Sequence, residues 1–420
     1  MPSIELNAQI PLPDALAVGR SESIYSADLE NHEKELIDQI KGSRILVIGG
    51  AGSIGSNTID TLSKYKPKSL HVVDQNENGL ADLVRHLRSR DGGLQVEDFR
   101  ALPLNYGNPA FSYYLNECPA FDYILNFAAL KHVRSEKDHY SILEMLNTNL
   151  MLMSNLMHAL SKVGAPKNFF SVSTDKAANP SSMMGASKRI MEHFLFSTSL
   201  TRPENMRTTS ARFANVAYSN GSLLQSFHER IRLKQPLVAP KDCKRYFVSL
   251  QESGHICTLA GFLAPENTIL IPKLNPEEHL TTLESVLLSF IDYHGFKPEF
   301  FDDETSARKA MQNLYEQKKW PVLLTPLDTA GEKPYEEFFR SDETVIDVGL
   351  ESLSGVVYQE PDKSSIIQLK DELAELMSTQ LSTKNTKTLD KNRLKSLIGA
   401  VEPEFLKTHK ESTSNLDQRM

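Results

Sequence analysis

The chain has 420 residues, of which 40% are hydrophobic and 24% charged, values typical of a globular protein with a full α/β core. The net charge of −8 argues against nucleic acid as the main partner, because such a binding surface should be basic. The three cysteines, Cys118, Cys243 and Cys257, show no metal-ligand spacing, so we expect no metal and buried thiols in a reducing compartment. No apolar run could span a membrane and no signal-peptide pattern opens the chain, which predicts a cytoplasmic protein.

Strand-like apolar runs alternate with helical patterns from residue 44 to residue 214, after a polar lead-in with a helix over Asp28–Ile40. This alternation predicts an α/β fold with a Rossmann-type, doubly wound parallel sheet. Strands are expected at 44–50, 69–74, 98–105, 123–129, 168–174 and 207–214, and helices at 53–64, 77–90, 138–163 and 183–199.

After about Asn215 the alternation stops and shorter elements follow, punctuated by prolines, at 222–234, 250–262 and 280–294. They predict a smaller lobe that closes over the carboxyl edge of the sheet. Beyond Pro361 an amphipathic helix, Ile366–Met377, leads into a polar run, which predicts a weakly ordered or partner-contacting tail. The expected organisation is a helical lead-in at 1–40, a Rossmann domain at 41–215, a substrate-binding lobe mixed with it at 216–360, and a helical or polar tail at 361–420.

A glycine triplet, Gly49, Gly52 and Gly55, joins the first expected strand to a helix. The glycines permit a tight turn and the close approach of a pyrophosphate, and the helix N-terminus offers free N–H groups and a favourable dipole. Asp74 ends the second strand, where an acid pairs with the ribose hydroxyls of NAD and repels the extra phosphate of NADP. The segment predicts an NAD site rather than an NADP site; a glycine-rich turn without ligand is the alternative.

The stretch from Phe170 to Lys188, FSVSTDKAANPSSMMGASK, carries the expected reactive groups. It places an acid beside a base, Asp175 and Lys176, at the carboxyl end of a strand, where ligands bind in open parallel sheets. Met184 and Lys188 follow on one face of a helix. A solvated turn is the alternative interpretation of an adjacent Asp-Lys pair, and the other motifs of the chain argue against it.

Six motifs occur in order: Gly49–Gly55, NFAALKHV (126–133), STDKAANPSSMMGASK (173–188), RFANVAYSNGS (212–222), RYF (245–247) and GEKPYEE (331–337). Together they resemble the nucleotide-sugar 4,6-dehydratases of polysaccharide biosynthesis, lyases of the extended short-chain dehydrogenase type. The segments VVDQNEN, KHVRSEKD and NLDQRM are similar to the subgroup linked to legionaminic-acid-type sugars. The resemblance implies tightly bound NAD and a nucleotide-sugar substrate, UDP-GlcNAc first and a GDP-sugar as the alternative. We also expect a homo-oligomer.

The resemblance implies that NAD takes hydride from C4 of the sugar and returns it at C6, giving a 4-keto-6-deoxy sugar. In this chemistry Asp175 is the acid at O6, Lys176 the base at C5, and Thr174 the partner of the 4-hydroxyl, while Lys188 holds the nicotinamide ribose. The implied cofactor-binding residues are Gly49, Gly52, Ser53, Ile54, Gly55, Asp74, Asn105, Ala128, Ala129, Asn149 and Lys188. The implied substrate-binding residues are Lys131, Asn215, Ser222, Arg245 and Glu332.

Met184 stands where short-chain dehydrogenases usually carry a tyrosine base. A thioether cannot take a proton, so the proton of the 4-hydroxyl must leave through Thr174 or Asp175. Met184 itself is expected to pack as an apolar side chain without a chemical role. The substitution favours a dehydratase over a tyrosine-dependent epimerase. Two alternatives stay open: a nucleotide-sugar epimerase, and a non-catalytic NAD-binding protein with the same fold.

Overall fold

The computed structural model describes residues 14–131, 136–198, 200, 202–326, 335–378 and 389–409. The first six strands start where the sequence predicts. The strand at 69–74 also ends as predicted, and the other five stop two or three residues earlier, because their last expected residues enter the loops at the carboxyl edge. These strands are β1 (Arg44–Ile48), β2 (Ser69–Asp74), β3 (Asp98–Pro103), β4 (Tyr123–Asn126), β5 (Asn168–Val172) and β6 (Arg207–Ala211). The helices between them are α4 (Ser53–Lys64), α5 (Glu77–Ser89), α6 (Pro109–Glu117), α7 (His139–Leu146), α8 (Leu152–Val163) and α9 (Met183–Phe196).

Within the described residues the main sheet has nine strands in the order β14-β15-β10-β6-β5-β4-β1-β2-β3. The six strands β1 to β6 are parallel, as predicted, and their order in the sheet, β3-β2-β1-β4-β5-β6, is the Rossmann order. Strand β10 (Thr268–Pro272) adds a parallel neighbour to β6, and β15 (Leu353–Val357) and β14 (Val345–Asp347) complete the sheet in antiparallel pairings. The strand order reverses at β1 and β4, so a crevice for ligands is expected at their carboxyl ends.

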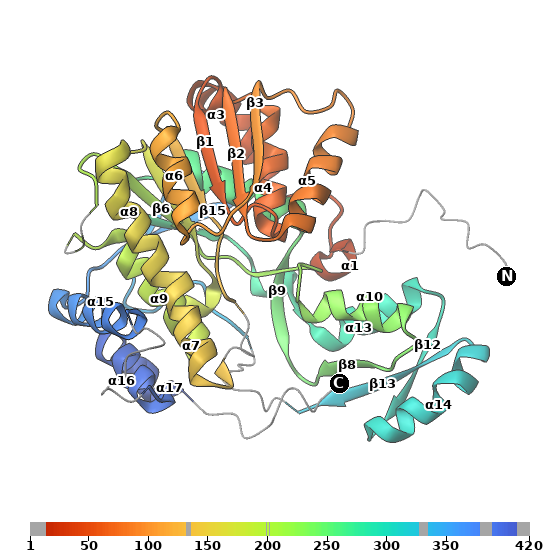
Figure 1. Cartoon of the computed structure of the whole chain (residues 1–420). Coiled ribbons are helices and arrows are strands. Elements are labelled where there is room, and N and C mark those ends of the chain that lie inside the picture. The colour runs from red at the N-terminus through yellow and green to blue at the C-terminus, as the bar shows by residue number, and fades with distance from the viewer. Residues whose placement is uncertain are drawn as a thin grey trace.

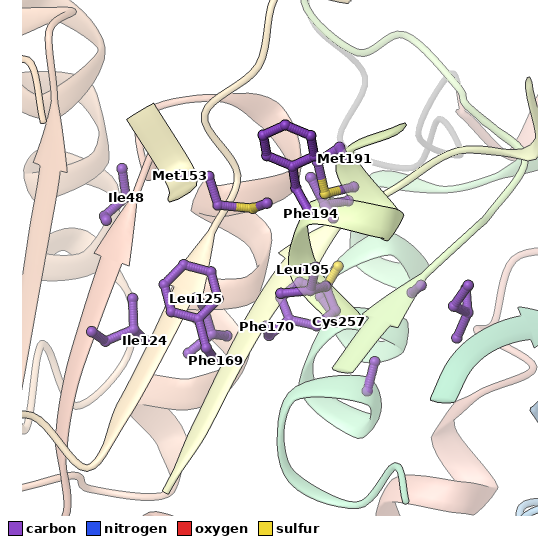
Figure 2. Packing of buried hydrophobic residues seen from close by; sticks show 14 of the residues in the cluster. Ile48, Ile124, Leu125, Met153, Phe169, Phe170, Met191, Phe194, Leu195 and Cys257 are labelled. Carbon is purple, nitrogen blue, oxygen red and sulfur yellow. The ribbon is translucent and has the colours of Figure 1, made fainter. Parts of the chain in front are cut away.

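Helices cover both faces of the sheet because right-handed crossovers on the two sides of β1 lead to opposite faces. Helix α4 packs with α11 (Leu250–Phe262), whereas α8 and α9 belong to the other layer (Figure 1). Adjacent strand residues such as Phe169 and Phe170 alternate between the faces and are fully buried. Figure 2 shows the core around them, with Met153 from α8, Phe194 from α9 and Cys257 from α11.

A smaller lobe has its own parallel sheet of β12 (Lys297–Phe301), β13 (Lys319–Thr325) and β8 (Leu237–Pro240) within the described chain. Trp320, Phe227 and Phe290 are buried at its centre. Strands β7 (Asn215–Val216), β9 (Lys244–Val248) and β11 (Leu280–Thr282) pair beside it. Its helices are α10 (Leu223–Arg232), α12 (Pro276–His279), α13 (Leu283–Tyr293) and α14 (Glu304–Glu316). Because α11, β10, β14 and β15 return to the main sheet, residues 216–360 contribute to both units.

The helix expected over residues 28–40 is interrupted at His32, between α2 (Ser26–Asn31) and α3 (Glu33–Ile40), and a short helix, α1 (Asp14–Val18), precedes both. The buried Asp28 carboxylate explains the anchoring of this region, since it accepts the backbone N–H groups of Glu351 (2.6 Å) and Ser352 (2.9 Å). No helix in the described ranges is both long and apolar enough to cross a membrane.

The C-terminal segment differs from the weakly ordered tail that the sequence predicts. Helix α15 (Lys363–Met377) is followed by α16 (Lys391–Val401) and α17 (Pro403–Thr408). Leu394, Ile398 and Phe405 are fully buried in the main core, which is why the described residues 391–409 fold onto the body of the protein. In Figure 1 these blue helices lie beside the yellow helices α7 and α9, and α16 packs against both.

Candidate active site

A cavity of about 750 Å³ lies at the carboxyl ends of β1, β2, β4 and β5, where the strand order reverses. The loops after β1, β2 and β3 form one part of its wall. The end of β5, helix α9 and residues 213–222 form another part. The predicted site residues that line it are Gly49, Gly52, Ser53, Ile54, Gly55, Asp74, Asn105, Ala128, Ala129, Lys131, Thr174, Asp175, Lys176, Lys188, Asn215 and Ser222.

The glycine turn after β1 is required by close backbone contacts. Gly49 has a φ of +76°, and a Cβ there would lie 2.6 Å from the backbone nitrogen of Ala128. A Cβ on Gly55 would lie 2.6 Å from the carbonyl oxygen of Gly49. Gly52 differs, because its φ is −71° and its nearest protein atom would be 3.4 Å away. Gly52 caps α4 without a side chain, so the N–H groups at the start of this helix face the cavity uncovered.

The end of β2 is tied to the glycine turn by a carboxylate. Asp74 accepts the backbone N–H of Ala51 (3.0 Å) and that of Asn76 (2.9 Å), one on each oxygen. Each carboxylate oxygen has a second lone pair, so Asp74 can hold the turn and still accept hydroxyl groups from a ligand. Asn105 is held in the same way by the N–H of Gly107 (2.8 Å).

Three predicted reactive groups meet at the end of β5. Asp175 has an exposed fraction of 2%, and its Oδ1 accepts the Thr174 hydroxyl at 2.8 Å and the Lys176 ammonium at 3.1 Å. The Lys176 side chain is 27% exposed, so its amine reaches the cavity while Asp175 stays enclosed. The short helical turn Asp175–Ala177 holds the acid and the base on adjacent backbone positions. The group can therefore give and take protons at one place.

Helix α9 presents Met184 and Lys188 to the same cavity. The Lys188 amine is 5% exposed and donates to the Val172 carbonyl at 2.6 Å. Burial lowers the pKa of Lys188 to about 8, although the nearby Glu192 carboxylate opposes this shift. The backbone N–H of Met184 donates to Glu136 at 3.0 Å, and burial raises the pKa of that carboxyl group.

Two predicted site residues of the described chain, Asn149 and Arg245, do not line the cavity. Asn149 instead braces its wall: its oxygen accepts the N–H of Leu130 (2.9 Å), and its amide donates to the carbonyl of Leu130 (3.1 Å) and to Ser187 (2.9 Å). It supports the wall in this way, and its predicted contact with a cofactor stays a prediction. Arg245 lies on β9 outside the lining and donates to the Lys244 carbonyl at 2.8 Å. Glu332 falls outside the described residues.

The sequence reasoning missed Tyr106, Glu144 and Thr148, which line the cavity together with Asn105. The Tyr106 hydroxyl donates to the Thr148 carbonyl at 2.9 Å, and the Thr148 hydroxyl contacts Glu144 at 3.3 Å. A π-helical turn, η2 (Asn147–Met151), separates α7 from α8 here. Such a turn changes which residues share a face, and it is often found at functional sites. In the sequence, only the four-residue spacing of Glu144 and Thr148, which places two residues on one face of a helix, could have indicated that these two residues act together.

The family model described as "Polysaccharide biosynthesis protein" matches residues 45–357. The chain belongs to this family. It is 31% identical over 279 residues to an uncharacterized membrane protein of Methanocaldococcus jannaschii, a match that covers 66% of this chain and 80% of the relative. The capsular polysaccharide biosynthesis protein CapD of Staphylococcus aureus is 27% identical, over 80% of this chain, and the chain spans only 55% of its length. A UDP-N-acetylglucosamine 4,6-dehydratase (inverting) of Campylobacter jejuni is 27% identical, over 59% of this chain and 71% of the relative.

Solved structures share the fold at low identity. Pen from Bacillus thuringiensis aligns with a TM-score of 0.60 and 21% identity, covering 81% of this chain and 99% of that protein. A UDP-N-acetylglucosamine 4-epimerase from Methanobrevibacter ruminantium aligns with a TM-score of 0.53 and 15% identity, covering 81% of this chain and the whole of that protein. Both solved structures agree with the Rossmann-type architecture that the strand order shows.

Proposed function

We propose that this protein binds NAD and catalyses the 4,6-dehydration of a nucleotide-activated N-acetylhexosamine, with UDP-GlcNAc as the first candidate substrate. The observation that carries this proposal is the convergence of Thr174 and Lys176 on the enclosed Asp175 carboxylate, in the same cavity as the glycine turn. The family and the Campylobacter relative named as a 4,6-dehydratase support the same reaction class. The product would be a 4-keto-6-deoxy sugar for surface polysaccharide synthesis.

The residues around the glycine turn fit a dinucleotide. The turn leaves room for a pyrophosphate at the uncovered N-terminus of α4, where N–H groups and the helix dipole favour anions. The Asp74 carboxylate can accept ribose hydroxyls and would repel a 2′-phosphate, which favours NAD over NADP. Lys188 would offer donors to the second ribose, and Asn105 would lie near the adenine. When bound, NAD supplies the hydride acceptor for C4 and the hydride donor for C6.

The side chains at the end of β5 have complementary roles in the elimination. The Thr174 hydroxyl would hydrogen-bond the 4-hydroxyl of the sugar. Once C4 is a ketone, the C5 proton is acidic, and the Lys176 amine would remove it while Asp175 donates a proton to O6 as it leaves as water. Lys176 would return a proton to C5 when hydride adds to C6. The proton of the 4-hydroxyl would pass through Thr174 to Asp175, 2.8 Å away, and replace the proton that leaves with the water.

Other residues that line the cavity are assigned to the substrate. Lys131, Asn215 and Ser222 line the cavity, and Ser222 begins α10 at the border of the smaller lobe. A diphosphate would meet the Lys131 ammonium and the N–H groups at the start of α10. Asn220 ties this wall to the dinucleotide side, because its N–H donates to the Ser53 hydroxyl at 2.8 Å.

The test is incubation of the purified protein with UDP-GlcNAc, followed by mass spectrometry of the nucleotide sugar. Dehydration removes one water per sugar without consuming external cofactor. A C4 epimerase would leave the mass unchanged and alter the stereochemistry, and a non-catalytic protein would change neither. Epimerisation at C4 needs no elimination, so the Asp175–Lys176 pair favours dehydration. A substrate panel that includes the GDP-sugar and shows no loss of water would overturn the proposal.

A further inference from the structure

We propose that the C-terminal helix pair α16–α17 is a positioning element of the active site, and that Glu402, between the two helices, is its principal positioning residue. The inference rests on the proposed function only for its activity measurement. The helix pair lies beyond residue 357, where the match to the family model ends.

The first argument is the packing around α9, the helix that presents Met184 and Lys188 to the cavity. Every residue of α9 is buried, and α16 packs directly against it. Leu394 and Ile398 of α16 and Phe405 of α17 are fully buried in the same core that contains α9. The C-terminal helices therefore form one wall of the compartment that fixes α9 (Figure 1).

The second argument is the set of charged contacts made by Glu402. Its side chain is 6% exposed and lies 2.6 Å from His193 Nε2, 3.4 Å from Arg189 Nε and 3.5 Å from Arg340 Nη1. Burial lowers the pKa of His193, so the neutral ring donates Nε2–H to Glu402. Because both His193 and Arg189 belong to α9, Glu402 restrains the rotation of this helix about its axis.

The third argument is continuity from this cluster to the reactive strand. Arg189 pairs with Glu343 (2.5 Å) and Glu192 (3.3 Å). Glu192 is fully buried, accepts two bonds from Arg212, and accepts the Ser173 hydroxyl at 2.6 Å. Ser173 lines the cavity and directly precedes Thr174. A chain of ion pairs and hydrogen bonds therefore joins the C-terminal helices to the strand end that carries the acid and the base.

The fourth argument is a separate anchor within the Asp175–Lys188 stretch. The Thr408 hydroxyl donates to the Pro180 carbonyl at 2.8 Å, and His409 Nδ1 lies 3.1 Å from the Ser181 carbonyl. These carbonyls belong to the connection between the Asp175–Ala177 turn and α9. The next residue, Ser182, caps α9 by accepting the N–H of Gly185 at 3.0 Å. The C-terminal segment thus contacts the middle of the Asp175–Lys188 stretch and also holds α9 just beyond its end, through Arg189 and His193.

The experiment compares Glu402→Ala and Glu402→Gln with Glu404→Ala, a control two residues away on α17. Glu404 has a 64% exposed side chain and pairs with the exposed Lys407. Misplacement of reacting groups by about 1 Å can lower turnover by up to about a hundredfold, so we expect a fall in kcat of about tenfold or more in Glu402→Ala. KM and NAD affinity should change by less than about twofold, because neither ligand touches Glu402. Glu402→Gln keeps an acceptor for His193 and should recover part of the loss, whereas Glu404→Ala should match the wild type.

Thr408→Val provides a second variant that removes one hydroxyl bond and leaves the buried charges in place. It should lower kcat about threefold and raise amide hydrogen exchange in residues 177–186 without raising it in β1–β3. Exchange is measured without substrate, so failure of the wild type to dehydrate sugars would overturn the proposed function and leave this test intact. Wild-type kcat and wild-type exchange in the folded Thr408→Val protein, or a parallel loss of kcat in Glu404→Ala, would overturn the positioning role.

Discussion

The dinucleotide side of the cavity and its reactive side are built by different physical means. The dinucleotide side is shaped by backbone, since Gly49 and Gly55 leave no space for a Cβ and the turn needs few distant residues. The reactive side is shaped by side chains, and these are held by buried bonds such as Ser173–Glu192 and His193–Glu402. A backbone-shaped site fails when the turn itself is altered. A side-chain-shaped site can also be disabled by changes far from the ligand.

The sharpest test of the reactive side is removal of its acid or its base. Asp175→Asn and Lys176→Met should each lower dehydration by about 10²–10⁴-fold while the protein stays folded with NAD bound, because general acid–base groups contribute about that much. Lys167→Met is the matched control, since Lys167 forms a pair of the same 3.1 Å length with Asp122 but away from the cavity. Near-wild-type turnover in either of the first two variants would exclude that residue from the mechanism.

The dinucleotide side can be tested by separating two glycines of one turn. Gly55→Ala should destabilise the fold by about 1–3 kcal/mol, because its Cβ would meet the Gly49 carbonyl at 2.6 Å. Gly52→Ala should leave thermal unfolding of the cofactor-free protein nearly unchanged, since its nearest contact would be 3.4 Å, yet weaken NAD binding. Thermal unfolding and NAD titration of both variants check this. Equal destabilisation by the two substitutions would contradict the assignment of Gly52 to the ligand.

Asp74 both holds the backbone of the glycine turn and is proposed to favour NAD over NADP. Its charge and its hydrogen-bond acceptor should therefore be removed in separate variants. Asp74→Asn retains an acceptor for the N–H of Ala51, whereas Asp74→Ala removes both acceptor and charge. Both should shift the NAD to NADP affinity ratio toward NADP by about tenfold, because the repulsion of a 2′-phosphate is lost. Only Asp74→Ala should also loosen the turn and lower thermal stability. Release of mostly NADP from the denatured wild type would show that the argument from Asp74 is wrong.

Lys188 gives the reactive side a pH dependence whose sign follows from its burial. Its pKa is lowered from 10.5 to about 8, so its amine loses its charge as the pH rises above about 8. NAD affinity should then fall severalfold between pH 7 and 9.5, since the donor to the ribose becomes neutral. Stability should change with the opposite sign. Between about pH 8 and 10.5 the unfolded chain binds more protons at this group than the folded chain does, so the contribution of Lys188 to the free energy of unfolding increases as the pH rises. Lys188→Met should remove both trends, and a flat wild-type titration of NAD would contradict the ribose contact.

Local patterns in the sequence were sufficient for most of the main sheet and the dinucleotide side. The strand period, the glycine spacing and the position of Asp74 are each set by residues close together in the chain. The same is true of Asp175 and Lys176, which are neighbours in sequence and remain neighbours in the cavity.

The parts that could not be predicted depend on distant contacts. The docking of α16 and α17 comes from buried residues such as Phe405 and from Glu402, which meets α9 across 209 sequence positions. The polar composition predicted a weakly ordered or partner-contacting tail, because polar residues are usually solvated. The residues that Phe405 and Glu402 contact are visible only in the fold. The bonds of Asn149 are also between distant residues: its amide donates to Leu130 and Ser187, and these bonds could not be predicted, while its cofactor contact stays a prediction.

The smallest expected effect concerns Met184, and it tests whether every side chain on the reactive side has a chemical task. Met184 lines the cavity one helical turn before Lys188, and its own backbone N–H is already bonded to Glu136. Its thioether cannot carry a proton, so we expect Met184→Leu to keep the rate within about twofold, as near-isosteric apolar substitutions are usually mild. Met184→Tyr should lower the rate, because a phenol would crowd the sugar while Thr174 and Asp175 already serve the C4 hydroxyl. Steady-state kinetics of the two variants separate these roles. A rise in activity with tyrosine would reveal a retained tyrosine mechanism, and a leucine variant as inactive as Lys176→Met would give the thioether a direct part in the reaction.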